Sequence, residues 1–300
     1  MQLRDALAGA VERLTAADVG SPRLNAETLL MFTLGCDRAY LYAHPERELT
    51  AAEEARYGSA LAQRARGVPA QYITGHQEFW GLDFMVSPAV LIPRPETEHV
   101  VETVLALAAE QNAKPGSTET LRIVDVGTGS GCIALALASE LRQAEIIGSD
   151  ISRDALEVAR ANAARLQFAS RVSFRESDLL AGFSEAEHKE SQHKKEAPFD
   201  FVVSNPPYVG AGEADKVQRQ VREFEPHVAV FAGQDGLDIY RRLIPQAQRV
   251  LKPGGWLVME IGYSIEAGVR ALLEGWSEVR TTNDLQGIPR VVAARKESGQ

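Results

Sequence analysis

The sequence has few cysteines, no excess of basic residues and no long apolar run, and each absence excludes a class of protein. Its two cysteines, Cys36 and Cys132, are too few for a disulfide framework or a zinc cluster, which fits a reducing compartment. Lysine and arginine total 32 against 41 acidic residues, a formal net charge of −9. Because proteins that grip duplex DNA usually present a broad basic face, DNA is a disfavoured partner.

Apolar residues never continue for the roughly 20 positions that a membrane span needs. Residues 1–14 mix charged and apolar side chains at helical spacing, so they predict an amphipathic helix and not a signal peptide. We therefore expect a cytoplasmic protein that does not bind a membrane. Cys132 lies inside an apolar run and is interpreted as a small core residue, not as a nucleophile.

The composition that remains is that of an ordinary globular protein, with 45% hydrophobic and 24% charged residues. A length of 300 residues suggests two domains, since one domain takes about 150. Ser21-Pro22 can begin a helix that ends at Gly35, and the segment from Thr50 to Glu53 has the pattern of a capping box. Residues 1–70 are therefore predicted to form a small helical bundle.

Residues 71–92 differ from this bundle because they are rich in β-branched and aromatic side chains. The pattern predicts extended structure or a hairpin that links two domains. Two prolines in residues 93–95 exclude regular structure directly after it. Thr97 can then cap a helix that reaches about Glu110.

Strands and helices alternate from residue 121 to the end of the chain. Such alternation is typical of a mainly parallel sheet that helices cover on both faces, so residues 93–300 are predicted to form an α/β domain. The predicted strands are 121–126, 146–148, 172–175, 199–203, 255–261, 279–281 and 290–294, and the predicted helices are 133–141, 152–166 and 237–251. Residues 184–198 interrupt the pattern as a polar, charge-mixed surface loop, in which His188 and His193 are interpreted as solvated side chains and not as metal ligands.

A glycine-rich turn follows the first of these strands and precedes a helix. Glycines permit a tight turn close to a ligand, and the start of the helix offers free N–H groups to it. Asp150 ends the next strand, where a carboxylate can accept hydrogen bonds from both hydroxyls of an adenosine ribose. Its alternative role is to cap the helix at Ser152. The candidate cofactor-binding residues of the turn are Gly127, Thr128, Gly129, Ser130 and Gly131.

The fourth strand leads into Asn205, Pro206, Pro207 and Tyr208. The two prolines fix the backbone and remove two N–H donors, which leaves carbonyl acceptors. Asn205 adds a side-chain carbonyl, and Tyr208 offers a flat face for stacking. The turn therefore predicts a site that holds a planar group bearing an NH₂, with an ordinary strand-exit turn as the alternative.

The glycine-rich turn, Asp150 and this turn together resemble the motifs of class I S-adenosylmethionine methyltransferases. The resemblance implies a Rossmann-like fold and an enzyme that acts on an amide or an exocyclic amine. Further motifs narrow the resemblance to the bacterial HemK/PrmC family, the glutamine methyltransferases of peptide-chain release factors. The resemblance runs from the N-terminal helices to residue 292, with residues 184–198 as its one clear departure. The motifs lie at residues 71–75, 78–81, 91–98, 223–226, 236–240 and 260–262.

The resemblance implies a protein-(glutamine-N5) methyltransferase that transfers a methyl group from S-adenosyl-L-methionine to the glutamine of a Gly-Gly-Gln motif. It implies that residues 127–131 and Asp150 hold the cofactor and that Leu179 lies beside the adenine. Asn205 would touch both cofactor and substrate. The glutamine site, with no metal and no assigned general base, would be formed by Asn205, Pro206, Pro207 and Tyr208.

The release factor would dock on the N-terminal bundle, which a hairpin joins to the catalytic domain. The oligomeric state is open, with a monomer as the expectation. Phe79 and Trp80 are predicted either to line the pocket or to lie in a core between the domains. The segment around Arg94 is predicted either to line the pocket or to join the domains. Glu96 and Glu98 are interpreted as acids at a helix N-terminus.

Three other functions remain open at this point. The first is methylation of a glutamine in a ribosomal protein, which uses the same chemistry. The second is methylation of adenine N6 in DNA, which needs base flipping and normally a basic recognition region, of which the sequence has no sign. The third is a nucleotide-binding module without catalysis, against which the intact Asn205–Tyr208 turn argues.

Overall fold

The computed structural model describes residues 1–112, 120–183 and 198–298, which form two compact units. The first unit combines Met1–His76 with Gln218–Phe224, and the second combines Gln77–Val217 with Glu225–Gln300. The predicted loop at 184–198, with His188 and His193, lies almost wholly outside the described residues.

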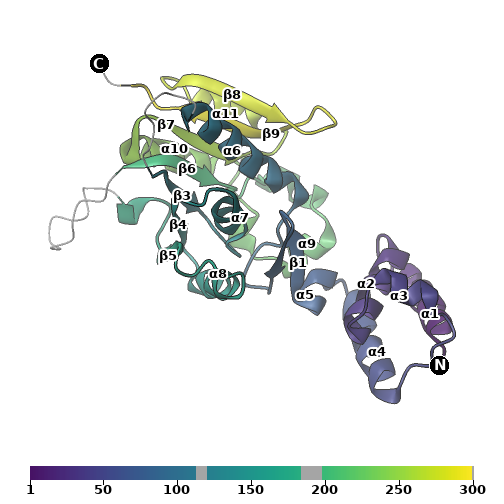
Figure 1. The fold of residues 1–300 in the computed structure, drawn as a ribbon. Helices are drawn as coiled ribbons and strands as arrows, with labels where there is room; N and C mark the ends of the chain where they lie inside the picture. Colours follow the sequence, from purple (N-terminus) through teal and green to yellow (C-terminus); the bar gives the residue numbers. More distant parts are fainter. Residues whose placement is uncertain (113–119, 184–197, 299–300) are drawn as a thin grey trace. The chain divides into compact units, whose positions relative to one another are not determined.

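The first unit is built from helices around one apolar core (Figure 1). The predicted second helix begins at Pro22 and ends at Gly35, which has the left-handed φ of 65° that favours glycine. The predicted capping box is also present, because the Thr50 side chain accepts from the Glu53 N–H and the Glu53 carboxylate accepts from the Thr50 N–H. The helices are α1 (Leu3–Ala16), α2 (Pro22–Leu34), α3 (Arg38–Ala43), α4 (Ala51–Ala65), α5 (Ala70–Thr74) and α9 (Arg219–Phe224).

Helix α9 is far from the other helices in sequence, and a buried arginine ties it to them. Arg64 on α4 is only 7% exposed. Its guanidinium donates to the Asn25 Oδ1 at 2.7 Å, to the Val68 carbonyl at 3.1 Å and to the Gln220 Oε1 at 3.0 Å. Because a buried charge needs hydrogen-bond partners, Arg64 favours the arrangement in which α9 completes this unit.

The expectation of extended structure directly from residue 71 was wrong. Residues 70–74 form the short helix α5, which Gly75 ends at a left-handed φ of 77°. The hairpin follows it, as β1 (His76–Phe79) and β2 (Leu82–Met85). Trp80 and Gly81 form the turn with φ of 55° and 69°, the positive pair that a two-residue hairpin loop of this type requires.

The second unit contains a seven-stranded sheet in the order β5-β4-β3-β6-β7-β9-β8. The first five strands in this order are parallel, and β9 runs antiparallel to both β7 and β8. The mainly parallel α/β fold predicted from the alternation is confirmed. The strands are β3 (Arg122–Val126), β4 (Glu145–Asp150), β5 (Val172–Glu176), β6 (Phe199–Ser204), β7 (Leu251–Glu260), β8 (Ser277–Asn283) and β9 (Pro289–Arg295).

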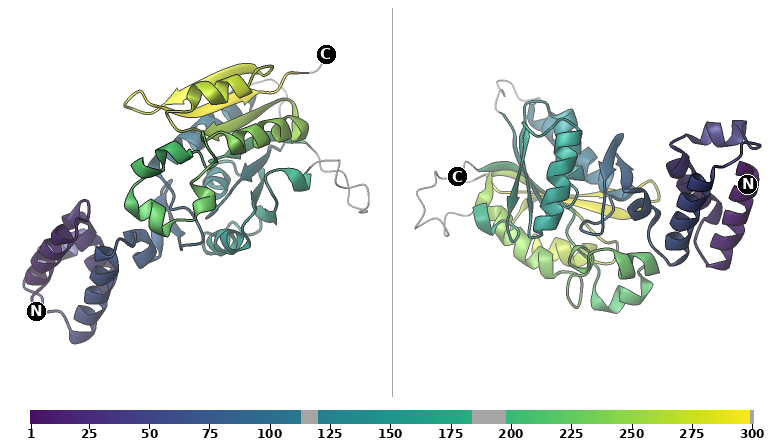
Figure 2. Two further views of the ribbon diagram at one scale, coloured as in Figure 1. Left: turned by 180° about the vertical axis from the view of Figure 1, so that it is seen from behind. Right: turned by 90° about the horizontal axis from the view of Figure 1, so that it is seen from below.

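Helices cover both faces of this sheet (Figures 1 and 2). Neighbouring residues of one strand enter opposite cores: Ile123 packs with α6 and α7, and Val124 packs with α10 and α11. The helices are α6 (Glu98–Asn112), α7 (Cys132–Glu140), α8 (Arg153–Arg165), α10 (Asp238–Val250) and α11 (Glu266–Leu272), with 3₁₀ turns η1 (Pro95–Thr97), η2 (Ala181–Phe183), η4 (Ala211–Lys216) and η5 (His227–Ala229). Across both units, no helix among the described residues has the length and apolarity to cross a membrane.

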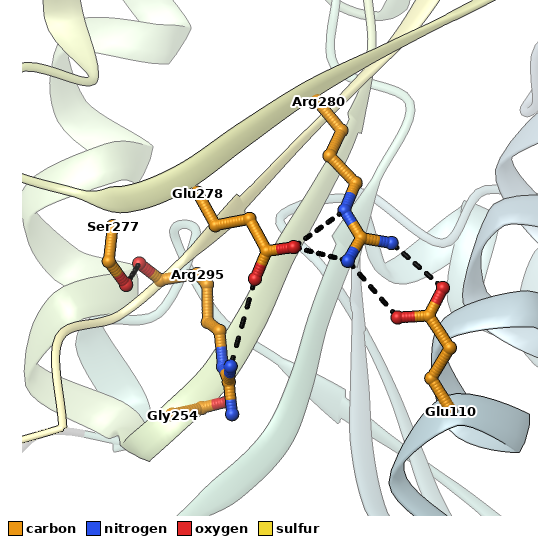
Figure 3. Close-up of polar contacts among 6 residues, drawn as sticks. All are labelled: Glu110, Gly254, Ser277, Glu278, Arg280 and Arg295. Atoms are coloured by element: carbon orange, nitrogen blue, oxygen red, sulfur yellow. Dashed lines mark hydrogen bonds and ion pairs between the residues drawn. The ribbon is translucent and has the colours of Figure 1, made fainter.

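The antiparallel edge of the sheet is fastened by an ion-pair network (Figure 3). Arg280 on β8 donates to the Glu110 carboxylate of α6 at 2.8 and 3.1 Å and also pairs with Glu278. The guanidinium groups of Arg280 and Arg295 lie 5.0 and 5.8 Å from the Trp256 ring. The stacking and the bidentate pairing together hold α6 against the edge strands.

The order of the strands determines where a ligand can bind. The chain moves outward from β3 to β4 and β5 and then returns to the other side of β3 as β6. In open α/β sheets, ligands bind at such a reversal, beyond the carboxyl ends of the strands. The glycine-rich turn, Asp150 and Asn205 all follow strands that end there.

Candidate active site

The glycine-rich turn joins β3 to α7 and is fastened to the end of β4. The N–H groups of Gly127 and Thr128 both donate to the Ser149 carbonyl, at 2.8 and 2.9 Å. Gly127 has a φ of 72°, and no atom lies within 4 Å of the position that a Cβ would take there. The turn therefore leaves its backbone open on one side.

A buried carboxylate supports the turn from below. Asp125 is fully buried at the end of β3, and its Oδ2 accepts a hydrogen bond from the Thr128 Oγ1 at 2.6 Å. Burial raises the pKa of Asp125 to about 7. Asp125 is not among the residues that line the cavity described below, so it supports the turn and does not face a ligand.

Asp150 joins the glycine-rich turn to the start of α8 through its carboxylate. Its Oδ2 accepts from the Gly129 N–H at 2.9 Å, and its Oδ1 accepts from the Ser152 N–H at 2.9 Å. Burial raises the pKa of Asp150. Asp150 also lines the cavity described next.

A cavity of about 200 Å³ lies beyond the ends of β3, β4 and β6 in the second unit. Of the predicted cofactor-binding residues, all but Gly131 line it: Gly127, Thr128, Gly129, Ser130, Asp150, Leu179 and Asn205. Gly131 instead provides the left-handed φ of 83° directly before α7.

The four residues that follow β6 divide between the cavity and its support. Asn205 and Pro207 line the cavity, whereas Pro206 and Tyr208 are not among the lining residues. The Tyr208 hydroxyl points to the Glu260 Oε1 at 3.4 Å, and the ring packs on the core that α10 covers. The negative charge of Glu260, together with burial, raises the pKa of Tyr208.

Two buried residues join this site that the sequence did not assign to it. Thr97, expected to cap α6, ends the 3₁₀ turn η1 directly before that helix, and its Oγ1 donates to the Glu260 Oε2 at 2.6 Å. The same Oγ1 accepts from the Asn205 Nδ2 at 3.0 Å. Burial raises the pKa of Glu260 to about 7. In the sequence, Thr97 and Glu260 lie within the motifs at 91–98 and 260–262, which do not reveal that the two side chains are partners.

The part of the cavity wall at Arg94 is held by another buried acid. Arg94 lines the cavity, as predicted, and donates to the Glu225 carboxylate at 2.5 Å. Glu225 also accepts from the Ile92 N–H at 3.1 Å. Phe79 and Trp80 are not part of this wall, because Phe79 is buried in the core of the second unit and Trp80 packs against that core.

The cavity has no feature of a thiol or metal site. Cys132 is half-buried and lines the cavity, and burial raises the pKa of its thiol to about 12, so the thiol stays protonated at neutral pH. In the described part of the chain, no group of three or more His, Cys, Asp or Glu side chains is placed to hold a metal ion.

Gly262 provides the space that the Tyr208 ring occupies. A Cβ at position 262 would lie 2.9 Å from the Tyr208 Cδ2. We therefore expect Gly262→Ala to lower the free energy of unfolding by about 1–3 kcal/mol through overpacking, as measured by urea denaturation. Gly58→Ala on α4 is the control, since its Cβ meets no atom and should stabilise the helix by up to about 1 kcal/mol. Equal stability of Gly262→Ala and the wild type would show that the ring moves freely.

Comparison with known proteins identifies the class to which this fold and site belong. Residues 117–288 match the family model described as "Methyltransferase domain", and residues 5–75 match "PrmC N-terminal domain". The solved N-terminal domain of human METTL16 in complex with SAH superposes with a TM-score of 0.52 at 16% identity, covering 96% of this chain and 94% of that one. At that identity the likeness concerns the fold alone. The protein is a methyltransferase with a mainly parallel α/β catalytic fold.

Closer relatives specify the family. The chain is 55% identical over 296 residues to the release factor glutamine methyltransferase of Koribacter versatilis, covering 99% of both chains. It is 43% identical over 287 residues to the protein of the same name from Bradyrhizobium diazoefficiens, covering 95% of this chain and 91% of the relative. The chain belongs to the family of release factor glutamine methyltransferases, and the resemblance drawn from the sequence is confirmed.

Proposed function

We propose that this protein transfers a methyl group from S-adenosyl-L-methionine to the side-chain amide nitrogen of the glutamine in the Gly-Gly-Gln motif of peptide-chain release factors. The observation that carries the proposal is full-length membership of the family, combined with an Asn-Pro-Pro-Tyr turn whose Asn205 and Pro207 line the cavity beside Asp150. Because the proposed substrates are release factors, we infer that the protein acts in the cytoplasm.

The residues around the cavity fit S-adenosyl-L-methionine, which would supply a methyl group on a positively charged sulfur. Asp150 offers its carboxylate, which backbone N–H groups hold at the cavity, to the ribose hydroxyls. Gly127 leaves open space for close approach, and Leu179 and Ile151 offer apolar surface to the adenine. The cofactor-binding residues are Gly127, Thr128, Gly129, Ser130, Asp150, Leu179 and Asn205, with Gly131 shaping the turn.

The substrate side of the cavity must activate a poor nucleophile. The lone pair of an amide nitrogen is delocalised, so orientation matters more than a strong base. The Asn205 Oδ1 and the Pro206 carbonyl accept the two N–H bonds of the glutamine amide, while Pro207 and Tyr208 keep this turn rigid. Such positioning can contribute about 7–11 kcal/mol to lowering a barrier.

The same acceptors stabilise the charge that develops on the nitrogen during transfer. Carbonyl dipoles aimed at a developing positive charge need no reorganisation as the reaction proceeds. The proton leaves late, to solvent, and no side chain is assigned as general base. The N-terminal unit docks the release factor, so that the Gly-Gly-Gln loop reaches the cavity.

A methyl-transfer assay with labelled cofactor tests this function. The purified protein is offered a release factor, a ribosomal extract and DNA in parallel. We expect the label on the release factor, and its absence from a release factor whose Gly-Gly-Gln glutamine is replaced by alanine. Label on a ribosomal protein or on DNA, with none on the release factor, would overturn the proposal.

A further inference from the structure

The half-buried Asn205 and two buried side chains form a chain of hydrogen bonds that begins at the cavity. The Asn205 Nδ2 donates to the Thr97 Oγ1 at 3.0 Å, and the Thr97 Oγ1 donates to the Glu260 Oε2 at 2.6 Å. Thr97 and Glu260 are each 2% exposed. The backbone carbonyl of Glu260 accepts from the Tyr240 hydroxyl at 2.7 Å, which fixes the end of β7.

The direction of these bonds is determined by chemistry. A hydroxyl has a single proton, and an ionised carboxylate can only accept. Thr97 therefore uses its proton on Glu260 and presents a lone pair to Asn205. A proton on Oε1 would leave Oε2 accepting, whereas a proton on Oε2 would reverse the direction, so the relay of Asn205, Thr97 and Glu260 belongs to the form of Glu260 whose Oε2 is unprotonated.

The consequence falls on the carboxamide of Asn205. Because Thr97 offers it a lone pair, the NH₂ end must face Thr97, and the Oδ1 end is left for the cavity that Asn205 lines. Among the described residues, no group donates to this Oδ1. A flip of the carboxamide would place two acceptors against each other at Thr97 and a donor toward the cavity.

We propose that Glu260 and Thr97 are positioning residues that fix the orientation of the Asn205 carboxamide and so make the site select a substrate group that donates N–H bonds. The inference rests on the proposed function, and it extends that function to substrate discrimination. A glutamine amide satisfies the Asn205 Oδ1, whereas the carboxylate of a glutamate in the same place opposes it with a second acceptor. The relay of Asn205, Thr97 and Glu260 thus makes the site distinguish glutamine from glutamate, two side chains of nearly equal shape.

The first test replaces Thr97 by valine, which keeps the shape and removes the hydroxyl. We expect kcat for the release factor to fall about tenfold or more, because Asn205 loses the partner that orients it. The KM for S-adenosyl-L-methionine should change less than about threefold, because the substitution leaves Asp150 and the glycine-rich turn, which make most of the proposed cofactor contacts, unchanged. Thr97→Ser, which restores the hydroxyl, should recover most of the lost turnover.

A second measurement reads the discrimination itself. A release factor with glutamate in place of the motif glutamine is used as a competitive inhibitor, and its affinity is compared with that of the glutamine form. Wild-type protein should prefer the glutamine form, and Thr97→Val should narrow that preference by about tenfold. Thr103→Val on α6 is the matched control, because its hydroxyl bonds outside the site to the His99 carbonyl and to Thr282, and it should leave the preference unchanged.

The outcomes separate the relay from the proposed function. Absence of label on the release factor with wild-type protein would defeat the function. The relay would still be tested by NMR, since the carboxamide protons of Asn205 should exchange slowly in the wild type and faster in Thr97→Val. Fast exchange in the wild type, unchanged kcat in Thr97→Val, or an unchanged preference for glutamine over glutamate would overturn the relay.

Discussion

Replacement of Asn205 by alanine should lower the kcat of methyl transfer by about 10²–10³-fold while the protein stays folded. The side chain provides an acceptor for the substrate amide, and loss of a preorganised dipole at a reacting centre typically has an effect of this size. The measurement is single-turnover methylation of a release factor at saturating cofactor. Thermal unfolding of the variant, recorded in parallel, reports whether the fold is intact.

The matched control for this substitution is Asn283→Ala, at the exposed end of β8. It removes the same group from the surface and should leave turnover within about twofold of the wild type. Surface substitutions usually change the free energy of unfolding by no more than about 0.5 kcal/mol, so the fold and the site should stay intact. Global unfolding of Asn205→Ala would instead show that Asn205 is a structural residue. Its bond to the buried Thr97 is the contact through which it would stabilise the fold.

Replacement of Asp150 by alanine should weaken the binding of S-adenosyl-L-methionine by about 10²-fold or more. Two hydrogen bonds to a charged acceptor contribute roughly 1.5–3 kcal/mol each, and each 1.4 kcal/mol is a tenfold change in affinity. Isothermal titration calorimetry with S-adenosyl-L-methionine measures the effect directly. Asp150→Asn keeps one acceptor oxygen and should lose less.

Asp150 also orders the local backbone, so a control is needed for indirect effects. Its carboxylate accepts from the N–H groups of Gly129 and Ser152, and both lose their partner in the alanine variant. The exposed Asp83, on β2, pairs with Arg165 at 2.9 Å away from the cavity, and Asp83→Ala should bind the cofactor as the wild type does. Unchanged affinity in Asp150→Ala would remove this carboxylate from the cofactor site.

The parts of the site that the sequence predicts are those that follow a strand directly. Gly127, Asp150 and Asn205 each come within two residues of a strand end. Because parallel strands bring their carboxyl ends to one edge of the sheet, their proximity follows from the alternation of elements alone. The order of the strands, which only the structure shows, places the reversal of chain direction across the sheet at β3.

The parts that the sequence does not predict depend on contacts between distant segments. Thr97 precedes α6 and has the local signature of a cap, but Glu260 at the end of β7 takes its hydroxyl. Helix α5 was also missed, since the β-branched residues in 71–74 favour a strand, whereas the structure has a short helix there that Gly75 ends. In both cases a local preference gave way to a specific partner or to one glycine.

The composite first unit has a consequence for how the chain folds as it is made. Helices α1 to α5 leave the ribosome early, but α9 emerges only after residues 77–217 have been synthesised. At bacterial elongation rates this delay is on the order of ten seconds, far longer than a helix needs to form. During that time the Arg64 guanidinium keeps its bonds to Asn25 and Val68 but lacks the one to Gln220, so the nascent first unit reaches its full set of hydrogen bonds only when synthesis has passed α9.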